Sequence, residues 1–362
     1  MSRKMSAQPY ISFVTYGRND GYTADYVPRV SRAVRCLAHQ LERAELPSEI
    51  IISEWNPPED SPLLVEALDI PAGLRHVTIA GVITGAEFHK HFLGADEVGI
   101  HVTEAANVGL RRARGEFIVG KSSDTFYSPE VIEKIARRNL RKDTIYRVDR
   151  HDVFIDDPAL WDLPDEVLLE TFATMPADVH GWIQQSPEWG LRALHTNACG
   201  DFTLMAARYW KELRGYPRDP TVLALDSDSL VLHAAASLGA TECCWPESCR
   251  VYKPAHSNMN AARVEQLWSP WQQRLDRYLL KRGNARAALW LRSTFNYPKR
   301  KVRRVNSITA ASIERNFVIP ARQWNEGVPY RPSQEVNWGL ADQRLETRVL
   351  CHAAWDDGLL AA

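Results

Sequence analysis

The sequence predicts an α/β protein with a mostly parallel central sheet flanked by helices, followed by a helical C-terminal extension. Three observations lead to this prediction. The first 150 residues alternate strand-like and helix-like segments, as in parallel sheets. The chain has 362 residues, of which 45% are hydrophobic, enough for one large domain and a smaller addition. From residue 258 onward the pattern is helical and rich in tryptophan.

The N-terminal elements are predicted from hydrophobic periodicity and from the residues that interrupt it. The run YISFVTY is rich in strand-forming residues, and the segment after its polar loop carries apolar residues at helical spacing. The second strand stops at NPPEDSP, where proline forbids continuation. The expected elements are strand 10–16, helix 26–46, strand 49–55, strand 74–81, a helix near 103–114 and strand 115–120.

Beyond residue 150 the pattern weakens and then returns. Residues 155–197 are rich in Pro, Gly, Trp and acids, which predicts long functional loops with a short helix or hairpin. A strand and a helix follow at 200–217, and a helix and a strand at 225–245. We therefore divide the chain into a domain at 1–257 and a Trp/Arg-rich helical extension at 258–362.

Composition excludes several classes of protein. The net charge of −1 argues against a nucleic-acid partner. The sequence shows no apolar N-terminal run before the first strand and no stretch of ~20 apolar residues, so we expect a cytoplasmic protein. There is no G-x-G-x-x-G after the first strand and no P-loop motif, which disfavours dehydrogenases and P-loop NTPases.

The six cysteines include no C-x-x-C pair, so a disulfide framework is not expected. Cys243, Cys244, Cys249 and His256 are a conceivable zinc set, but adjacent cysteines at a strand end are poor tetrahedral ligands. Buried free thiols are the favoured interpretation.

Polar side chains follow several predicted strands at the point where each strand ends. Residues 16–20 follow the first strand, Glu54 ends the second, and Asp124 follows the apolar run FIVG. In parallel sheets ligands bind at the carboxyl ends of strands, so these residues should converge on one edge. A carboxylate between small hydroxyl residues suits a divalent metal held mainly by a substrate diphosphate. The alternative is a helix-capping or turn aspartate.

The order of these segments resembles a family of enzymes. YISFVTYGRND, SEWNPPEDSPL, NVGLRRARGEFIVGKSSD, LHTNACGDFTLM with LRGYP, and LDSDSLVLHAAASLGA together look like a GT-A fold glycosyltransferase. The chain is similar to the family 2-like nucleotide-sugar transferases of bacteria over roughly residues 8–257. The resemblance implies a nucleotide-sugar donor, UDP-linked by family habit, a glycan or lipid-linked acceptor, and Mn²⁺ or Mg²⁺ as cofactor.

The resemblance also implies roles for the strand-end residues. Asp124 matches the last acid of the D-x-D motif and would bind the metal, but Ser122 stands where the family has the first acid. Lys121, beside them, would contact phosphate. The set that would surround the nucleotide is Thr15, Tyr16, Gly17, Arg18, Asn19, Asp20, Glu54, Ser122 and Ser123.

Sugar transfer with inversion needs a base to take the acceptor proton. By its place before the helix that ends at Gly239, Asp228 matches the family's base, and Asp226 is the alternative. Both also stand where a helix begins, so one of them can be a simple N-cap.

Three further residues complete the predicted site. Asp201 in CGDF matches a position that touches the donor or acceptor, although a turn aspartate is the plain alternative. His256 matches a second metal ligand, and Lys253 is placed to neutralise the leaving diphosphate, as is Arg250.

The extension and the overall function each leave alternatives open. Its amphipathic Trp- and Arg-rich segments suit a packed subdomain or a homodimer face, or else peripheral attachment to the inner membrane surface. The segment 320–339 reads as an arm that wraps a neighbour. Besides a transferase, the sequence is compatible with a degenerate scaffold or glycan-binding subunit and, less well, with a sugar nucleotidyltransferase.

Overall fold

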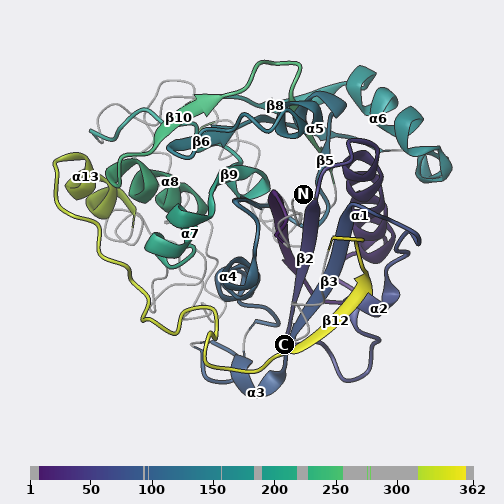
Figure 1. Cartoon of the computed structure of the whole chain (residues 1–362), viewed down its shortest axis with the longest axis horizontal. Helices are drawn as coiled ribbons and strands as arrows, with labels where there is room; N and C mark the ends of the chain where they lie inside the picture. The colour runs from purple at the N-terminus through teal and green to yellow at the C-terminus, as the bar shows by residue number, and fades with distance from the viewer. Residues whose placement is uncertain are drawn as a thin grey trace, which may run out of the picture.

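The chain folds into two β-sheets covered by helices. This computed structural model describes residues 8–92, 94–96, 98–155, 157–182, 190–217, 227–255, 275, 278 and 317–355. Within those residues the larger sheet has eight strands, in the order β10-β6-β9-β4-β1-β2-β3-β12 (Figure 1). They are β1 (Ile11–Gly17), β2 (Ser48–Trp55), β3 (Val77–Thr84), β4 (Phe117–Gly120), β6 (Thr144–Arg147), β9 (Thr203–Ala206), β10 (Thr241–Cys244) and β12 (Glu346–Cys351).

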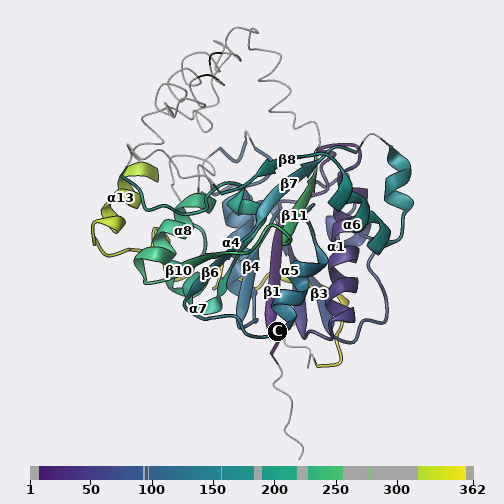
Figure 2. The ribbon, with the colours of Figure 1, turned by 90° about the horizontal axis from the view of Figure 1, so that it is seen from above.

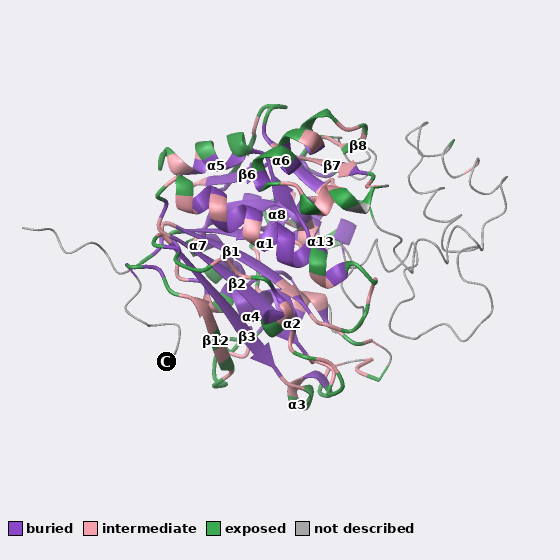
Figure 3. Cartoon of the chain, turned by 90° about the vertical axis from the view of Figure 1, so that its right-hand side faces the viewer, coloured by how far each residue is buried: buried purple, intermediate pink, exposed green. Residues whose placement is uncertain are grey.

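The centre of this sheet is parallel, as the sequence predicts. β1 pairs in parallel with β2 and β4, and β2 pairs in parallel with β3. β2 and β3 are buried at every position, and Figure 3 shows the same for the middle of the sheet. Helices cover both faces of a parallel sheet, which is why its strands are continuous apolar runs rather than alternating ones. The predicted α/β class is confirmed.

One strand of the sheet runs the other way, and this positions part of the site. β9 is antiparallel to both β4 and β6. An antiparallel strand starts at the edge where its parallel neighbours end. Gly120, the last residue of β4, pairs with Thr203, the first of β9. The turn Cys199–Asp201 before β9 therefore reaches the edge where residues 121–124 leave β4.

A second sheet contributes further residues to this edge. Within the described residues it has four strands, ordered β5-β11-β7-β8, and Figure 2 shows β7, β8 and β11 side by side. β11 pairs in parallel with β7, which sets Lys253 opposite Asp152. This sheet is not among the elements predicted from the sequence. Its strands are β5 (Phe126–Tyr127), β7 (Asp149–Val153), β8 (Ala177–His180) and β11 (Arg250–Pro254).

The larger helices pack on opposite sides of the central strands (Figure 1). α1 (Tyr26–Arg43) contacts β2, β3 and α5 (Pro129–Ala136), whereas α4 (Val102–Arg112) lies on β1 to β4 and contacts α7 (Ala207–Leu213). Gly109 allows α4 to approach closely, because a Cβ there would lie 2.6 Å from a methyl group of Val14. The remaining helices outside the extension are α2 (Leu64–Ala67), α3 (Ala86–His89), the 3₁₀ turn Pro158–Asp162, α6 (Asp165–Thr174) and α8 (Ser227–Ser237).

The described part of the C-terminal extension, residues 317–355, packs on the rest of the chain. α13 (Ile319–Asn325) contacts α8, and β12 adds an antiparallel strand beside β3, a strand that the prediction of a helical extension did not include. The segment expected to wrap a neighbour lies on its own chain: the Tyr330 hydroxyl donates to the Leu213 carbonyl at 2.9 Å. Among the described residues, no helix is long and apolar enough to cross a membrane.

All six cysteines are free thiols. Cys36, Cys199 and Cys249 are buried as expected, but Cys243 and Cys244 are exposed. They lie on β10, which is an edge strand of the larger sheet, and this explains their exposure.

Candidate functional site

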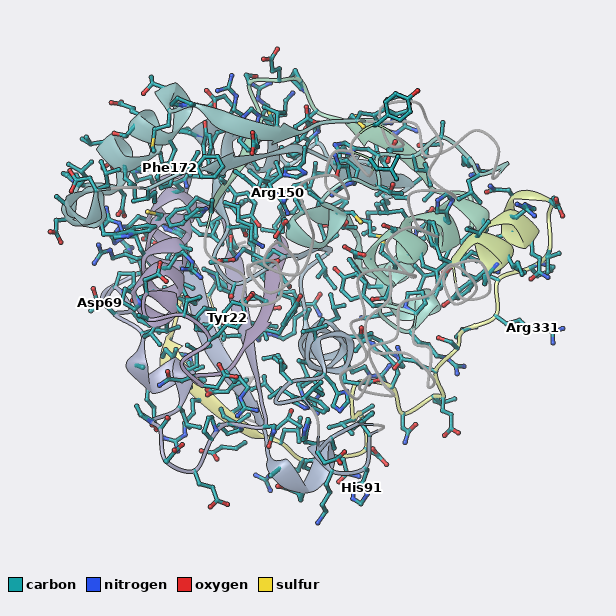
Figure 4. All side chains as sticks on the ribbon, turned by 180° about the vertical axis from the view of Figure 1, so that it is seen from behind. Tyr22, Asp69, His91, Arg150, Phe172 and Arg331 are labelled. Carbon is teal, nitrogen blue, oxygen red and sulfur yellow. The ribbon has the colours of Figure 1, made fainter. Side chains whose placement is uncertain are left out.

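A cavity of about 580 Å³ opens at the edge where β1 and β4 end. Tyr22, from the loop after β1, and Arg150, from β7, both line it and are labelled in Figure 4. Half of the predicted site residues meet here, so residues after β1 and after β4 converge as expected. Those lining the cavity are Tyr16, Gly17, Arg18, Asp20, Ser122, Ser123, Asp124 and Lys253.

One wall of the cavity is aromatic and aliphatic. Tyr16, Tyr22 and Tyr26 line it together with Ile100 and Val102. The rings of Tyr22 and Tyr26 meet edge to face with centroids 6.0 Å apart, and the Tyr26 hydroxyl is 3.1 Å from that of Ser123. Such a wall suits a planar ring that can stack on it.

Gly17 is required where this wall meets β1. A Cβ at that position would lie 2.3 Å from the Tyr26 hydroxyl and 2.9 Å from a methyl group of Leu64. The predicted glycine therefore acts by leaving room for Tyr26.

A chain of alternating charges lies beside the cavity. Arg29 Nε lies 3.0 Å from Asp124 Oδ2, and Lys253 Nζ lies 3.7 Å from Asp124 Oδ1. The same ammonium lies 2.9 Å from Asp201 Oδ1, and Arg150 Nη1 lies 2.6 Å from Asp201 Oδ2. Five residues that are distant in sequence are thus joined into one ion-paired network beside the cavity.

The network holds Asp201 and Lys253 in their charged forms. Burial alone would raise the pKa of Asp201, but Lys253 and Arg150 bring this pKa well below its usual range. Burial would likewise lower the pKa of Lys253, yet the carboxylates of Asp201 and Asp124 raise it above the ordinary value. Burial, with Asp201, Asp228 and Asp124 adding to it, raises the pKa of Tyr16 to about 12. Tyr16 therefore stays a neutral hydroxyl among three carboxylates.

Lys121 lies behind the cavity rather than in its lining. It is buried, and its Nζ lies 3.4 Å from the Ser123 carbonyl oxygen. Burial lowers its pKa to about 7, although Asp124 and Asp201 oppose the change. The predicted phosphate contact by Lys121 stays a prediction.

Replacing Lys121 by methionine is expected to stabilise the folded protein at pH 7 by about 1 kcal/mol or more, because the buried charge disappears. Below pH 7 the lysine is protonated in both states and its burial destabilises the fold in full. Between about 7 and its ordinary value of 10.5 only the unfolded chain holds the proton, so stability rises with pH. Urea unfolding across this range should show the rise in the wild type and not in Lys121→Met. A less stable variant that keeps the rise would contradict this account, and Lys142→Met is the matched exposed control.

The described residues do not fit a divalent metal at Asp124. No group of three or more His, Cys, Asp or Glu side chains that could hold a metal is found in the part of the chain that the structure describes. A dication at ~2.1 Å from Asp124 Oδ1 would lie within about 6 Å of the Lys253 ammonium. Their repulsion would cost about 5 kcal/mol at an effective dielectric constant of 20. His256, the second predicted ligand, lies outside the described residues.

Glu54, which the sequence analysis places around the nucleotide, does not line the cavity. It is fully buried, and its carboxylate accepts the backbone N–H groups of Leu64 at 2.5 Å and Val65 at 3.2 Å. Burial raises its pKa. This carboxylate fixes the loop after β2, and its predicted contact with the nucleotide stays a prediction.

Two other predicted residues of the first loop also stay out of the cavity. Thr15 is buried within β1, two residues before the strand ends. Asn19 donates from Nδ2 to the Pro62 carbonyl at 3.0 Å and so ties the loop to residues after β2.

Asp228 lies in the first turn of α8, against the turn that carries Asp201. Its Oδ1 accepts the Ser229 N–H at 2.9 Å, and a Cβ on Gly200 would lie 2.8 Å from its Oδ2. Burial and then Asp228 raise the pKa of the Cys199 thiol, which keeps that thiol neutral. The structure thus brings Asp228 to the same edge as Asp201. Asp226, the alternative base, lies outside the described residues.

Five residues of the cavity and its ion-paired network are not predicted from the sequence: Arg29, Arg150, Asp152, Tyr22 and Tyr26. Arg29 lies within a helix and has a side chain only 1% exposed, although a helical arginine ordinarily predicts a solvated charge. A usable signal was present in the loop after β1, where two tyrosines follow GRND within six residues.

Comparison with known proteins gives distant structural similarities. No family model and no curated protein matches the sequence. The chain is similar to S. aureus TarS, with a TM-score of 0.41 and 13% identity over 90% of this chain and 56% of that one. For TarS 1–349 in complex with UDP, the TM-score is 0.41 and the identity 12%, over 89% of this chain and 93% of that one. For the catalytic domain of Drosophila β1,4-galactosyltransferase 7 in complex with xylobiose, the TM-score is 0.33 and the identity 8%, over 65% of this chain and 63% of that one. The chain spans 56% of the full TarS chain.

Proposed function

We propose that the chain is a glycosyltransferase that moves a sugar from a nucleoside-diphosphate donor, a UDP-sugar, to a hydroxyl group of a glycan or lipid-linked saccharide, with inversion. The observation that carries the proposal is that one cavity is lined by both aromatic rings and fixed cations. Three tyrosines line it together with Lys253 and Arg150. A nucleotide sugar has the matching parts, a planar base and an anionic diphosphate.

The location and size of the cavity support this assignment. It lies at the carboxyl ends of parallel strands, where ligands bind in open α/β sheets. Its volume of about 580 Å³ is within the range of small-molecule sites. Arg18 also lines the cavity, and its side chain is held by donation to the Gly99 carbonyl and by an ion pair with Asp20 at 3.2 Å.

The chemistry requires one base and one stabilised leaving group. In the proposed reaction the acceptor oxygen attacks the anomeric carbon while the bond from that carbon to the diphosphate oxygen breaks. Asp228 takes the acceptor proton, and Lys253 and Arg150 stabilise the charge that develops on the diphosphate. Asp201 fixes both cations, at 2.9 Å from Lys253 Nζ and 2.6 Å from Arg150 Nη1.

Calorimetric titration with UDP, GDP, CDP and ADP tests the proposal. One diphosphate should bind more tightly than the others, and Tyr22→Ala should weaken its binding about tenfold through the loss of stacking. Tyr278→Ala is the matched control, because Tyr278 is an exposed tyrosine that does not line the cavity. If no diphosphate binds, the transferase proposal fails and the scaffold interpretation gains.

A further inference from the structure

The side chain of Lys253 occupies an unusual position for a lysine. Its ammonium lies between two buried carboxylates, 2.9 Å from Asp201 Oδ1 and 3.7 Å from Asp124 Oδ1. Both aspartate side chains are nearly inaccessible, at 6% for Asp124 and 5% for Asp201, whereas Lys253 keeps 20% exposure and lines the cavity. One face of the cation is thus held by protein carboxylates, and the other faces the space where a ligand would bind.

The backbone fixes this cation in place. Lys253 is the fourth of five residues in β11, which pairs in parallel with β7 so that Lys253 stands opposite Asp152. On the far side, the carboxylates that hold the ammonium are themselves held, Asp124 by Arg29 and Asp201 by Arg150. Because strand pairing fixes its backbone and two carboxylates fix its ammonium, the Lys253 side chain has little freedom to leave the site.

Among the described residues, the carboxylates beside Lys253 belong to no group of three ligands that could hold a metal, and they already pair with cations. Ser122 stands where the resemblance places a first motif acid. Asp124 and Asp201 already have cationic partners. The Ser122 side chain hydrogen-bonds to Asp201 and carries no charge. Serine at position 122 removes one negative charge from the site, and the Lys253 ammonium between Asp124 and Asp201 adds one positive charge. Both differences favour a fixed monocation over a bound dication.

From this geometry we infer that the ammonium of Lys253 takes the place of the divalent metal, linking Asp124 and Asp201 to the diphosphate of the donor. The inference rests on the proposed function and adds to it that donor binding is independent of metal. As the bond from the anomeric carbon breaks, its electron pair goes to the diphosphate oxygen, and the charge developing there lies against Lys253 and Arg150. The acceptor proton still goes to Asp228.

The direct test is calorimetric titration of UDP into the wild-type protein in excess EDTA and again in Mn²⁺. The two dissociation constants should agree within about threefold, because the cation is part of the chain. Wild-type binding that disappears in EDTA and returns with Mn²⁺ would overturn the inference and leave the proposed function standing. Absence of UDP binding in both conditions would overturn both.

Variants of Lys253 sharpen the test. In EDTA, Lys253→Met should weaken UDP binding at least tenfold, roughly the loss of one charge-assisted contact, whereas Lys253→Arg should keep most of it. Because Asp124 and Asp201 are then released, Mn²⁺ should restore part of the binding to Lys253→Met alone. Lys142→Met removes an exposed lysine that pairs with Glu116 and should change nothing. Unchanged UDP binding by Lys253→Met in EDTA would overturn the inference. If this variant does not fold, the comparison of wild-type UDP binding in EDTA and in Mn²⁺ is the deciding test.

Discussion

Replacing Asp228 by asparagine is expected to lower kcat for sugar transfer by about 10² to 10⁴, the usual contribution of a general base. The amide keeps the size of the side chain and an oxygen that can accept the Ser229 N–H, now accepted at 2.9 Å, so the start of α8 should persist. It cannot accept the acceptor proton. Initial rates of UDP release from a panel of UDP-sugars, measured with saturating donor, give the effect.

The result separates catalysis from helix capping. If Asp228 is the base, UDP affinity and thermal stability stay unchanged while the rate falls. A residue that only caps the helix would give lower stability and an unchanged rate. Glu130→Gln, which alters an exposed first-turn acid of α5, is the matched control for the charge of the first turn. A fully active Asp228→Asn enzyme would remove Asp228 from the mechanism.

Replacing Asp201 by alanine is expected to lower the free energy of unfolding by about 3–5 kcal/mol, the range found when one partner of a buried ion pair is removed. The carboxylate is buried and bonded to Lys253 at 2.9 Å and to Arg150 at 2.6 Å. Without it both cations lose a buried partner. Urea unfolding at pH 7 measures the loss, and Asp143→Ala, which removes an exposed ion pair with Arg141, should cause no measurable loss.

The stability that Asp201 supplies should also depend on pH in a defined direction. Its pKa in the fold is below the ordinary value of 3.8, so the stabilisation is complete above that pH. It is lost progressively as the pH falls from 3.8 toward the folded value. The difference between wild type and Asp201→Ala should therefore shrink in acid, and a difference that grows on acidification would contradict the assignment.

The place of the site in the fold is predictable from the sequence, but few of the contacts inside the site are. Residues after β1 and β4 converge because both strands are buried apolar runs whose parallel pairing follows from the alternation with helices. Glu54 looked equivalent to them, since it too ends a strand. Its carboxylate instead binds backbone N–H groups ten and eleven residues later, a contact that depends on the path of the loop.

The ion-paired network could not be read from local sequence. Arg29 has the spacing of an ordinary helical arginine, and its burial follows only once Asp124 is placed beside α1. Lys253 and Arg150 meet at Asp201 because β11 pairs with β7, a pairing between segments about a hundred residues apart. Likewise β12 is a short run of mixed polarity, and its pairing with β3 comes from the sheet edge it covers rather than from its own pattern.

The most direct test of the central claim, that this cavity is the nucleotide site, is hydrogen–deuterium exchange of the full chain with and without UDP. The account predicts added protection of the amides of residues 16–26, 121–124 and 250–255, which surround the cavity. Little change is expected at the groove between α1 and α5, lined by residues such as Ile132 and Ala136. Protection at that groove and not at the three cavity segments, or protection nowhere, would contradict the account.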